Sequence, residues 1–426
     1  MPNFSLSDEV FFDAAKQFDT PFHLYDEQGI RDTARGLKKA FAGVPDFREY
    51  FAVKALPTPA ILRILKSEGC GLDCASLTEL MLARACGFSG TEIMFSANDV
   101  PPEEFRLARE LGAYINLDDE SHVALLRDNG GVPNEVCLRY NPGGMFRIGN
   151  TIMGDPGDAK YGMTRQQLTS SLLALKSLGA TRFGLHSFLS SNTTDPSYYP
   201  SLAKLLFAVG RELMDETGMQ LSFVNLSGGI GIPYRPNEPT ADIEKIGEGV
   251  CEAYHQSFTQ NGIQGVAIKT ELGRYTTGAS GWLVTHITSE KHIYKHYLGL
   301  DATACDLMRP AMYGAYHHIT IPGKRHLPHD EKVDVTGSLC ENNDKFAIDR
   351  MLPKCGIGDL LVIHDTGAHG LSMGYNYNGK LRCKEVLYRA DGAFELIRRA
   401  ETPSDYFATL DIDPAWRALR EETKEG

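Results

Sequence analysis

The sequence predicts an α/β protein with an eight-stranded (β/α)8 TIM barrel followed by a second, mostly β domain. The first observation is that short apolar runs alternate with longer amphipathic stretches eight times between residues 48 and 274. Eight β-α units in roughly 230–250 residues are typical of a TIM barrel. The second observation is that strand-like segments separated by turns replace this alternation after about residue 275. A doubly wound sheet is the competing architecture, but it rarely needs eight strands in one uninterrupted series.

The apolar runs have the length and composition of buried strands. They lie at residues 48–55, 71–76, 92–98, 113–119, 135–141, 182–189, 221–229 and 267–274. The stretches between them, such as "PAILRILKSEG", carry apolar residues at three- and four-residue spacing and often end in glycine, as helices do. The long Gly-rich segment 141–164 after the fifth run predicts an active-site loop.

We expect the barrel to span residues 26–275 and the β domain residues 276–426. The second region contains "GWLVTHITSEKHIYKHYLGLD", "KVDVTGSLCE" and "GDLLVIHDTG", which resemble strands with little helix between them. Residues 1–25 form a separate N-terminal segment in this division. It includes most of "PFHLYD", which either starts the barrel or pairs with the β domain.

Composition argues against several classes of function. The net charge of −12 disfavours a nucleic-acid or anionic-membrane partner, since both require a basic surface. The first residues lack the pattern of a signal peptide, and no apolar run reaches the ~18 residues of a membrane helix, so we expect a cytoplasmic protein. Nine cysteines without a CxxC pair indicate reduced thiols. His317 and His318 lack a third ligand at suitable spacing, so no metal site is predicted.

Polar residues gather at or just after the ends of the predicted barrel strands. Catalytic groups of a TIM barrel lie at the C-terminal ends of its strands, so these residues are candidates for one site. They are Lys54, Asp73, Arg139, His186, Ser191, the "SGGIG" turn at 227–231, Glu271 and Arg274.

Three of these features together fit pyridoxal phosphate. A lysine can form an imine, a Gly-rich turn after the seventh strand can hold a phosphate, and Glu271 can pair with a protonated pyridine nitrogen. Each feature alone has a plainer interpretation: Lys54 as a solvated or ion-paired lysine, "SGGIG" as a tight turn, and Glu271 as a salt-bridge partner.

The predicted β domain supplies two further candidates. Cys340 and Glu341 form a proton donor beside an acceptor for a substrate ammonium, or they belong to an ordinary loop. Arg309 and Tyr313 form a clamp for a carboxylate, or Arg309 is structural and the aromatic residues around it pack in the core.

An ordered set of motifs resembles the fold-type III pyridoxal-phosphate-dependent decarboxylases, and within them the diaminopimelate decarboxylases. The set runs over nearly the whole chain. It comprises "FAVKA", "GLDCASLTEL", "LRYNPG", "AKYGM", "GLHSFLSSN", "SGGIGIPY", "ELGR", "RPAMYGAYHHI", "CENND", "DTGAHGLSMGYNYNG" and "RRAET".

The resemblance implies a role for each matching residue. Lys54 would carry the cofactor, Glu271 would pair with its ring nitrogen, and Cys340 would be the catalytic acid that returns a proton. The other expected cofactor-binding residues are Asp73, Arg139, His186, Phe188, Ser191, Ser227, Gly228, Gly229, Gly273, Arg274 and His369. The expected substrate-binding residues are Arg274, Arg309, Tyr313, Glu341 and His369. The family would also supply Cys340 and Glu341 from a partner chain, which implies a homodimer with shared active sites.

The chain departs from the family pattern at four positions. Phe188 stands where the family has a histidine that stacks on the cofactor, and His186 lies two residues earlier. His369 replaces a tyrosine, Ser227 replaces the first glycine of the phosphate turn, and Leu272 replaces the proline of "EPGR". We expect Leu272 to change little and the Ser227 hydroxyl to be available to the phosphate.

The expected activity is decarboxylation of meso-2,6-diaminopimelate to L-lysine, the last step of lysine biosynthesis. The alternatives are a related decarboxylase for another D-amino acid, a carboxynorspermidine or a carrier-bound amino acid, and a non-catalytic regulatory homologue. An ornithine decarboxylase fits less well, because its substrate would leave the arginine clamp unpaired. An amino-acid racemase shares the barrel and the cofactor but has no use for "CENND".

Overall fold

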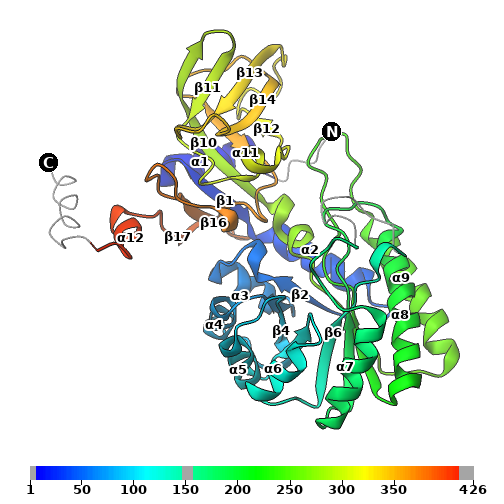
Figure 1. Ribbon diagram of the computed structural model, residues 1–426. Helices are drawn as coiled ribbons and strands as arrows, with labels where there is room; N and C mark the ends of the chain where they lie inside the picture. Colours follow the sequence, from blue (N-terminus) through cyan, green and yellow to red (C-terminus); the bar gives the residue numbers. More distant parts are fainter. Residues whose placement is uncertain (1–5, 146–156, 412–426) are drawn as a thin grey trace. The chain divides into compact units, whose positions relative to one another are not determined.

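The computed structural model describes residues 6–145 and 157–411. It divides the chain into two compact units, which are described separately. The barrel unit comprises Gln28–Pro233 and Asn237–Gly278, and the β unit comprises Met1–Glu27, Tyr234–Pro236 and Ala279–Gly426. Within the described residues, β2 to β9 form a closed parallel barrel and the other strands belong to the β unit (Figure 1). The predicted fold class is confirmed.

Each of the eight predicted runs overlaps with one barrel strand, although β8 begins one residue before its run. The strands are β2 (Arg48–Ala52), β3 (Gly71–Cys74), β4 (Ile93–Ser96), β5 (Tyr114–Leu117), β6 (Glu135–Arg139), β7 (Arg182–His186), β8 (Gln220–Asn225) and β9 (Ala267–Thr270). The helices along this part of the chain are α2 (Glu27–Ala40), α3 (Pro59–Ser67), α4 (Leu77–Ala85), α5 (Pro102–Leu111), α6 (His122–Asp128), α7 (Arg165–Ser177), α8 (Tyr198–Thr217), α9 (Ile243–Ser257) and α10 (Gly273–Thr277). The helices surround the barrel strands in Figure 1.

The predicted first strand is too long by three residues. Pairing with β3 ends at Ala52, and Val53–Ala55 form a 3-10 turn that the Leu56 N–H closes on the Val53 carbonyl. Lys54 therefore lies on a turn after β2 and not on the strand. Its neighbours Val53 and Ala55 are buried, whereas Lys54 is exposed.

A layer of buried side chains packs in the interior of the barrel. Tyr50, Met94, Cys137 and Phe223 pack together there, and they come from alternate strands, β2, β4, β6 and β8. Such layers are typical of TIM barrels. Gly184 of β7 leaves the room for this packing, because a Cβ at this position would lie only 2.2 Å from Cζ of Phe223. This packing fills part of the barrel interior with buried side chains.

The β unit is built on one mixed sheet. The strands are β1 (Phe22–Asp26), β10 (Gly281–His292), β11 (His296–Leu300), β12 (Ile319–Thr320), β13 (Glu331–Thr336), β14 (Lys345–Leu352), β15 (Leu360–Ile363), β16 (Lys384–Tyr388) and β17 (Phe394–Arg398). The main order is β14-β13-β11-β10-β1-β16-β17, and β15 pairs with both β10 and β12. The short helices are α1 (Asp8–Phe18), α11 (Arg309–Tyr313) and α12 (Pro403–Phe407). The "PFHLYD" segment forms β1, which pairs with β10 and β16.

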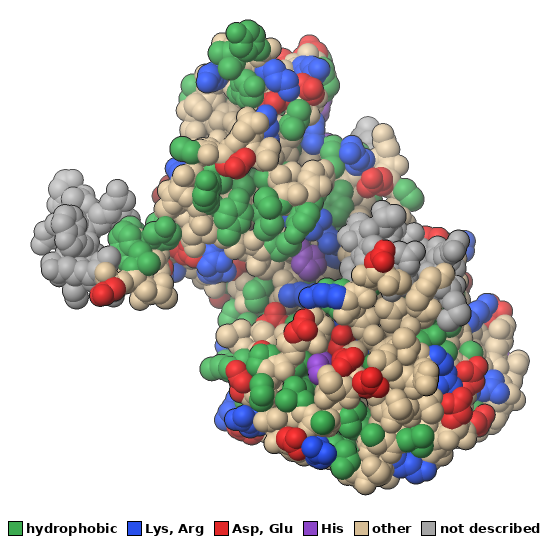
Figure 2. Space-filling model, viewed as in Figure 1, with side chains coloured by type: hydrophobic (Ala, Val, Ile, Leu, Met, Phe, Trp, Pro, Cys, Tyr) green, Lys and Arg blue, Asp and Glu red, His purple; other side chains and the backbone are tan. Residues whose placement is uncertain are grey.

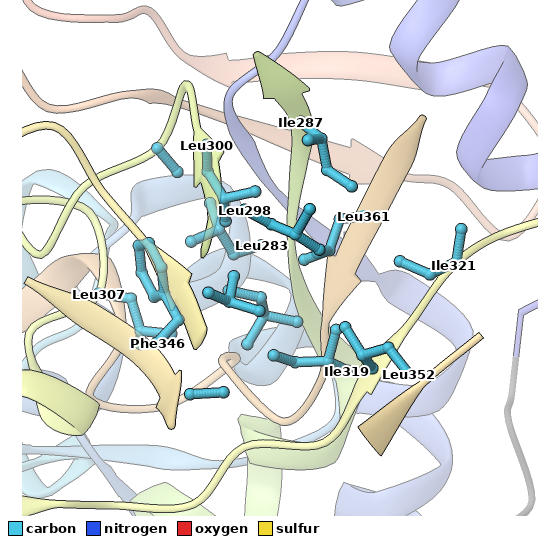
Figure 3. Close-up of a cluster of buried hydrophobic side chains, with 14 of the residues drawn as sticks. Leu283, Ile287, Leu298, Leu300, Leu307, Ile319, Ile321, Phe346, Leu352 and Leu361 are labelled. Carbon is cyan, nitrogen blue, oxygen red and sulfur yellow. The ribbon is translucent and has the colours of Figure 1, made fainter. Parts of the chain in front are cut away.

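A separate hydrophobic core stabilises this sheet. Leu283 and Ile287 of β10, Leu298 of β11 and Leu361 of β15 are buried in one cluster (Figure 3). Because this core draws on β-unit residues alone, the unit has an interior of its own, as an independent domain requires.

The surface charges and the helices give no sign of a membrane-spanning segment among the described residues. Acidic and basic side chains are interspersed over the visible face of the barrel unit in Figure 2. Among the residues that the structure describes, no helix combines the length and the apolar character needed to cross a bilayer. The predicted loop at 141–164 lies only in part within the described residues, since 146–156 fall outside them.

Candidate active site

A polar network occupies the barrel at the C-terminal ends of its strands. Its centre is the buried carboxylate of Glu271, directly after β9. Oε1 accepts hydrogen bonds from Asn225 Nδ2 at 2.7 Å and Ser96 Oγ at 3.5 Å, and Oε2 accepts one from Ser227 Oγ at 2.8 Å. His186 Nε2 lies 3.2 Å from the same Oε2. Side chains alternate between the two faces of a strand, so Ser96 and Asn225 lie on the same inward face as Met94 and Phe223.

These contacts keep Glu271 ionised. Burial alone would raise the pKa of its carboxyl group. The electrostatic interaction and hydrogen bond with His186, together with the bonds from Ser227 and Asn225, outweigh burial and lower this pKa to about 2. The barrel therefore holds a negative charge away from water at physiological pH.

Asp73 is a second buried carboxyl group in this network. Burial raises its pKa well above the ordinary value, and the charge of Glu271 raises it further, whereas the Lys54 ammonium opposes the shift. One carboxyl oxygen of Asp73 (Oδ1) and Nδ1 of His186 are buried without a hydrogen-bond partner. The charges of Lys54 and Glu271 thus both act on Asp73, so the three groups belong to one site. The two buried atoms without partners are available to hydrogen-bond a ligand there.

The glycine turn after β8 packs closely against the backbone of Glu271 and of the loop after β7. A Cβ at Gly228 would lie 2.8 Å from the Glu271 carbonyl oxygen and 3.5 Å from a ring carbon of Phe188. Gly229 has a φ of +123°, and a Cβ there would lie 3.0 Å from the Ser190 carbonyl oxygen. Backbone therefore approaches backbone closely at both positions, and only glycine leaves room for this. Turns of this kind can direct their backbone N–H groups toward an anion.

The Ser227 hydroxyl bonds to the buried Glu271 carboxylate, and its expected contact with the cofactor stays a prediction. Ser227 has a φ of +58°, in the left-handed region, where glycine is the usual residue. Its Oγ donates to Glu271, and its carbonyl oxygen accepts from the Glu271 N–H at 2.7 Å and from the Tyr199 hydroxyl at 2.6 Å. The hydroxyl that we expected to be available to a phosphate is therefore directed to the buried carboxylate.

The segment after β9 lies against the Lys54 turn. A Cβ at Gly273 would lie 2.8 Å from Cβ of Ala55, so only glycine allows the two segments to come this close. Leu272, which we expected to change little, donates its N–H to the buried Glu49 carboxylate at 2.6 Å. A proline at this position could not form that bond.

The remaining predicted residues of the barrel unit are less closely connected to Glu271. Arg139 forms an ion pair with Asp118 at 3.0 Å, and its guanidinium lies 4.4 Å from the ring centroid of Tyr161. Ser191 follows the partly buried Phe188 in the loop after β7, and Arg274 lies on α10, with its side chain partly buried. Contacts of Arg139, Ser191 and Arg274 with a cofactor stay predictions.

In the β unit, Cys340 and Glu341 lie on an exposed loop that Asp344 holds in place. The buried Asp344 carboxylate accepts the N–H groups of Ala304 and Leu339, each at 2.8 Å. The Cys340 N–H donates to Asn378 Oδ1 at 2.6 Å, and Glu341 Oε1 accepts from the Asn343 N–H. The backbone is therefore fixed while the thiol and the carboxylate remain exposed.

Arg309 and Tyr313 lie on the single short helix α11. Tyr313 and its neighbour Met312 are 64% and 61% exposed, and Figure 2 shows hydrophobic side chains at the surface of the β unit. The Arg309 guanidinium lies 5.9 Å from the ring centroid of Tyr234. His369 has a φ of +55° in the loop after β15.

Comparison with known proteins identifies the family. Residues 27–278 match a family model described as the pyridoxal-binding domain of pyridoxal-dependent decarboxylases. The chain belongs to this family of decarboxylases. Its cofactor is therefore pyridoxal phosphate, as the lysine, the glycine turn and the acid predict.

Related decarboxylases cover nearly the whole chain. Diaminopimelate decarboxylase of Methanothermobacter thermautotrophicus is 33% identical over 393 residues, with 92% of this chain and 91% of that protein covered. The crystal structure of diaminopimelate decarboxylase from M. jannaschii with L-lysine has a TM-score of 0.85 at 28% identity, with 95% and 94% covered. A protein called TabA, from Pseudomonas amygdali pv. tabaci, is 40% identical over 411 residues, with 96% and 95% covered.

The barrel of this decarboxylase has the groups that the cofactor requires. A permanently ionised, buried carboxylate suits a protonated pyridine nitrogen, because the two charges neutralise each other away from water. The buried Asp73 Oδ1 and His186 Nδ1 have hydrogen-bonding capacity that a polar ligand could use. The close approach at Gly228 and Gly229 places backbone carbonyl groups beside the turn, and Gly273 lets the segment after β9 lie against Ala55.

Sequence reasoning missed four polar residues of this site. Asn225 and Ser96 bind Glu271, Asn116 Nδ2 reaches Ser96 Oγ at 3.3 Å, and Asp118 pairs with Arg139. A signal was present, since each of them lies within one residue of the C-terminal end of a barrel strand. Short amides and hydroxyls at strand ends are common, and sequence alone did not show that they converge on one carboxylate.

Proposed function

We propose that this decarboxylase converts meso-2,6-diaminopimelate to L-lysine and carbon dioxide. The observation that carries the proposal is that two sets of residues coexist: the Glu271 network in the barrel unit and the Cys340–Glu341 loop in the β unit. The similarity to diaminopimelate decarboxylases over nearly the whole chain supports the same substrate.

The barrel residues would hold the cofactor in one orientation. Lys54 would attach it covalently, the turn at Gly228 and Gly229 would bind its phosphate, and Glu271 would keep a proton on its ring nitrogen. Phe188 would lie against the ring. When bound, pyridoxal phosphate supplies a sink for the electron pair that remains when the bond between Cα and the carboxylate breaks.

Residues of the β unit would select the substrate and complete the reaction. Arg309, with Arg274 of the barrel unit, would bind the carboxylate at the centre that does not react, and Glu341 would bind its ammonium. Cys340 would deliver a proton to Cα after carbon dioxide leaves. The fixed backbone and exposed side chains of the Cys340–Glu341 loop suit a group that acts on a separately bound ligand.

We further propose that the loop acts in the site of a second copy of the chain. The exposed Cys340, Glu341, Met312 and Tyr313 all belong to the β unit, and exposed aromatic and Met side chains are typical of contact surfaces. A two-fold dimer would let each chain complete the other's site.

Carbon dioxide release tests the substrate directly. We expect release from meso-diaminopimelate, with a kcat/KM well above those for L-lysine, L-ornithine and other D-amino acids at equal concentration. The panel should be run on the holoenzyme, with Glu341→Gln beside it, because loss of the ammonium partner should raise KM more than it disturbs cofactor binding. Release from another amino acid but not from meso-diaminopimelate would contradict the proposal.

The similarity to TabA gives a specific reason for testing alternatives. At 40% identity this relative is more similar to the chain than the diaminopimelate decarboxylase of M. thermautotrophicus, and its name states no substrate. A related amino acid, such as a carrier-bound one, is therefore the second candidate. A protein that binds pyridoxal phosphate but releases carbon dioxide from none of these compounds would instead be a regulatory homologue.

A further inference from the structure

Three potential metal ligands meet at the end of the hairpin formed by β10 and β11. His292 is the last residue of β10, His296 is the first of β11, and the two residues are direct cross-strand partners. Directly opposed residues project from the same face of a sheet, and so do residues two apart on one strand. The strand register therefore places Glu290, His292 and His296 on one face.

The side chains converge on a single point. Nε2 of His292 lies 2.9 Å and Nε2 of His296 lies 2.8 Å from the same oxygen, Oε1 of Glu290. The two imidazole rings stack with centroids 4.1 Å apart. One candidate ligand atom from each of the three side chains can be chosen so that all three atoms lie within 4.8 Å of one another.

The surroundings leave Glu290 available to these two histidines. Lys295, in the turn between the strands, bonds instead to Asp334 at 2.8 Å and Asp349 at 3.0 Å. Lys291 alternates to the other face of the strand. The second oxygen of Glu290, Oε2, would lie 3.4 Å from a Cβ at Gly356, so backbone flanks this side of the carboxylate.

We propose that Glu290, His292 and His296 form a binding site for a divalent transition-metal ion of the zinc class. Two imidazole nitrogens and one carboxylate oxygen are a ligand set that such ions accept, with bonds of about 2.0–2.2 Å. The ion would replace the proton shared between His292 Nε2 and Glu290 Oε1, would bind the His296 Nε2 that has no hydrogen-bond partner among the described residues, and water would fill the open position. This site belongs to the β unit and is independent of the proposed decarboxylation.

Zinc titration of the holoenzyme tests the site. After removal of bound metal by dialysis, ZnCl2 is titrated calorimetrically into the parent protein, His292→Gln, His296→Gln and a matched control, His255→Gln, which alters an exposed histidine on α9. Losing even an outer-shell partner weakens a metal site about 10–100-fold. We therefore expect the parent and the control to share one site that both hairpin variants lose or bind at least about tenfold more weakly.

Equal zinc isotherms for all four proteins would overturn the proposal. A second measurement uses the parent alone, so it does not depend on how the variants fold. Co2+ added to the metal-free parent should give visible absorption from a nitrogen- and oxygen-ligated ion, and equimolar Zn2+ should abolish it. A parent that binds no Co2+ and no Zn2+ would also overturn the proposal.

Discussion

At the scale of single residues, the site depends on how Glu271 is kept charged. A buried carboxylate is costly unless donors surround it, and here Asn225, Ser227 and His186 fill that role. Ser227 is the unusual member, because it adopts a glycine-like φ of +58° and still contributes its hydroxyl. The chain thus accepts local backbone strain and gains a hydrogen bond to the carboxylate.

We predict that Ser227→Ala lowers kcat/KM by about tenfold or more. A hydrogen bond to a charged group contributes about 1.5–3 kcal/mol, and the alanine removes the bond without changing the backbone. The measurement is steady-state carbon dioxide release together with the dissociation constant for pyridoxal phosphate. Glu271→Gln should lose far more activity, because it places an amide where Asn225 and Ser227 already donate.

Ser227→Gly separates the hydroxyl from the backbone. Glycine relieves the strained φ but also lacks the hydroxyl, so both variants should lose activity if the bond to Glu271 matters. Ser177→Ala is the matched control, since the exposed Ser177 hydroxyl donates to the Ala174 carbonyl at 2.7 Å on helix α7. Full activity in Ser227→Gly would show that the hydroxyl has no role.

Several of these residues were predictable from the sequence and others were not. Lys54, Asp73, His186 and Glu271 follow from their positions at strand ends, because a barrel brings those ends together. The hydrogen bond from the Ser227 hydroxyl to Glu271 was not predicted. A side chain beside a glycine turn has several acceptors within reach, and only the folded structure selects among them.

At the scale of elements, the strand ends and turns decide what reaches the site. The 3-10 turn after β2 moves Lys54 off the strand, and Gly273 lets the segment after β9 approach that turn. The eight strands were predictable because their apolar runs are short and regularly spaced. Where β2 ends was not, because "FAVKA" continues the apolar pattern through the turn.

We predict that Gly229→Ala destabilises the protein and weakens binding of pyridoxal phosphate. A residue forced into a sparsely populated backbone region costs about 1–3 kcal/mol, and the new Cβ would also lie 3.0 Å from the Ser190 carbonyl oxygen. The measurements are the thermal midpoint and a cofactor titration. Gly36→Ala on α2 is the matched control, because no atom lies within 4 Å of the added Cβ.

The control should shift stability in the opposite direction. Alanine is favoured over glycine in a helix interior by about 0.5–1 kcal/mol, so Gly36→Ala should raise the thermal midpoint. Equal shifts in both variants would contradict the conformational argument for the turn.

Lys269 on β9 predicts a pH dependence of stability. Its Nζ lies 3.8 Å from the ring centroid of Tyr114 and 3.1 Å from the Tyr50 hydroxyl. Burial lowers its pKa from 10.5 to about 7. Between these two pH values the unfolded chain binds the additional proton, so this residue makes stability rise with pH.

We expect Lys269→Met to be more stable than the parent at pH 7, on the order of 1 kcal/mol or more, because burial of a charge is removed. The gain should shrink as the pH approaches about 10, because the amine of the unfolded chain then also loses its proton and burial no longer costs a charge. Thermal midpoints of both proteins across this range measure it. A difference that stays constant with pH would mean that Lys269 does not titrate as stated.

At the scale of the whole molecule, the chain combines a cofactor-binding barrel with a β unit that has its own core. The predicted fold class is confirmed, because periodicity and turn spacing determine it. The pairing of the N-terminal β1 with β10 and β16 was left open by the sequence, since these contacts join segments far apart along the chain. Shared active sites remain a proposal at this scale.

We predict that inactive variants complement each other when mixed. In a dimer of one Lys54→Ala chain and one Cys340→Ala chain, one site would carry both substitutions and the other neither. After random exchange, activity should recover to about a quarter of the parent value if both variants are inactive alone. Carbon dioxide release after mixing measures this, and no recovery, with exchange verified by mass spectrometry, would argue for self-contained chains.

We propose that Lys54 holds pyridoxal phosphate beside Glu271 in the barrel. Borohydride reduction of the holoenzyme followed by peptide mass spectrometry tests it most directly. We expect a single phosphopyridoxyl group on the peptide that contains Lys54, and none in Lys54→Ala treated in the same way. A label on any other lysine, with Lys54 unmodified, would contradict it.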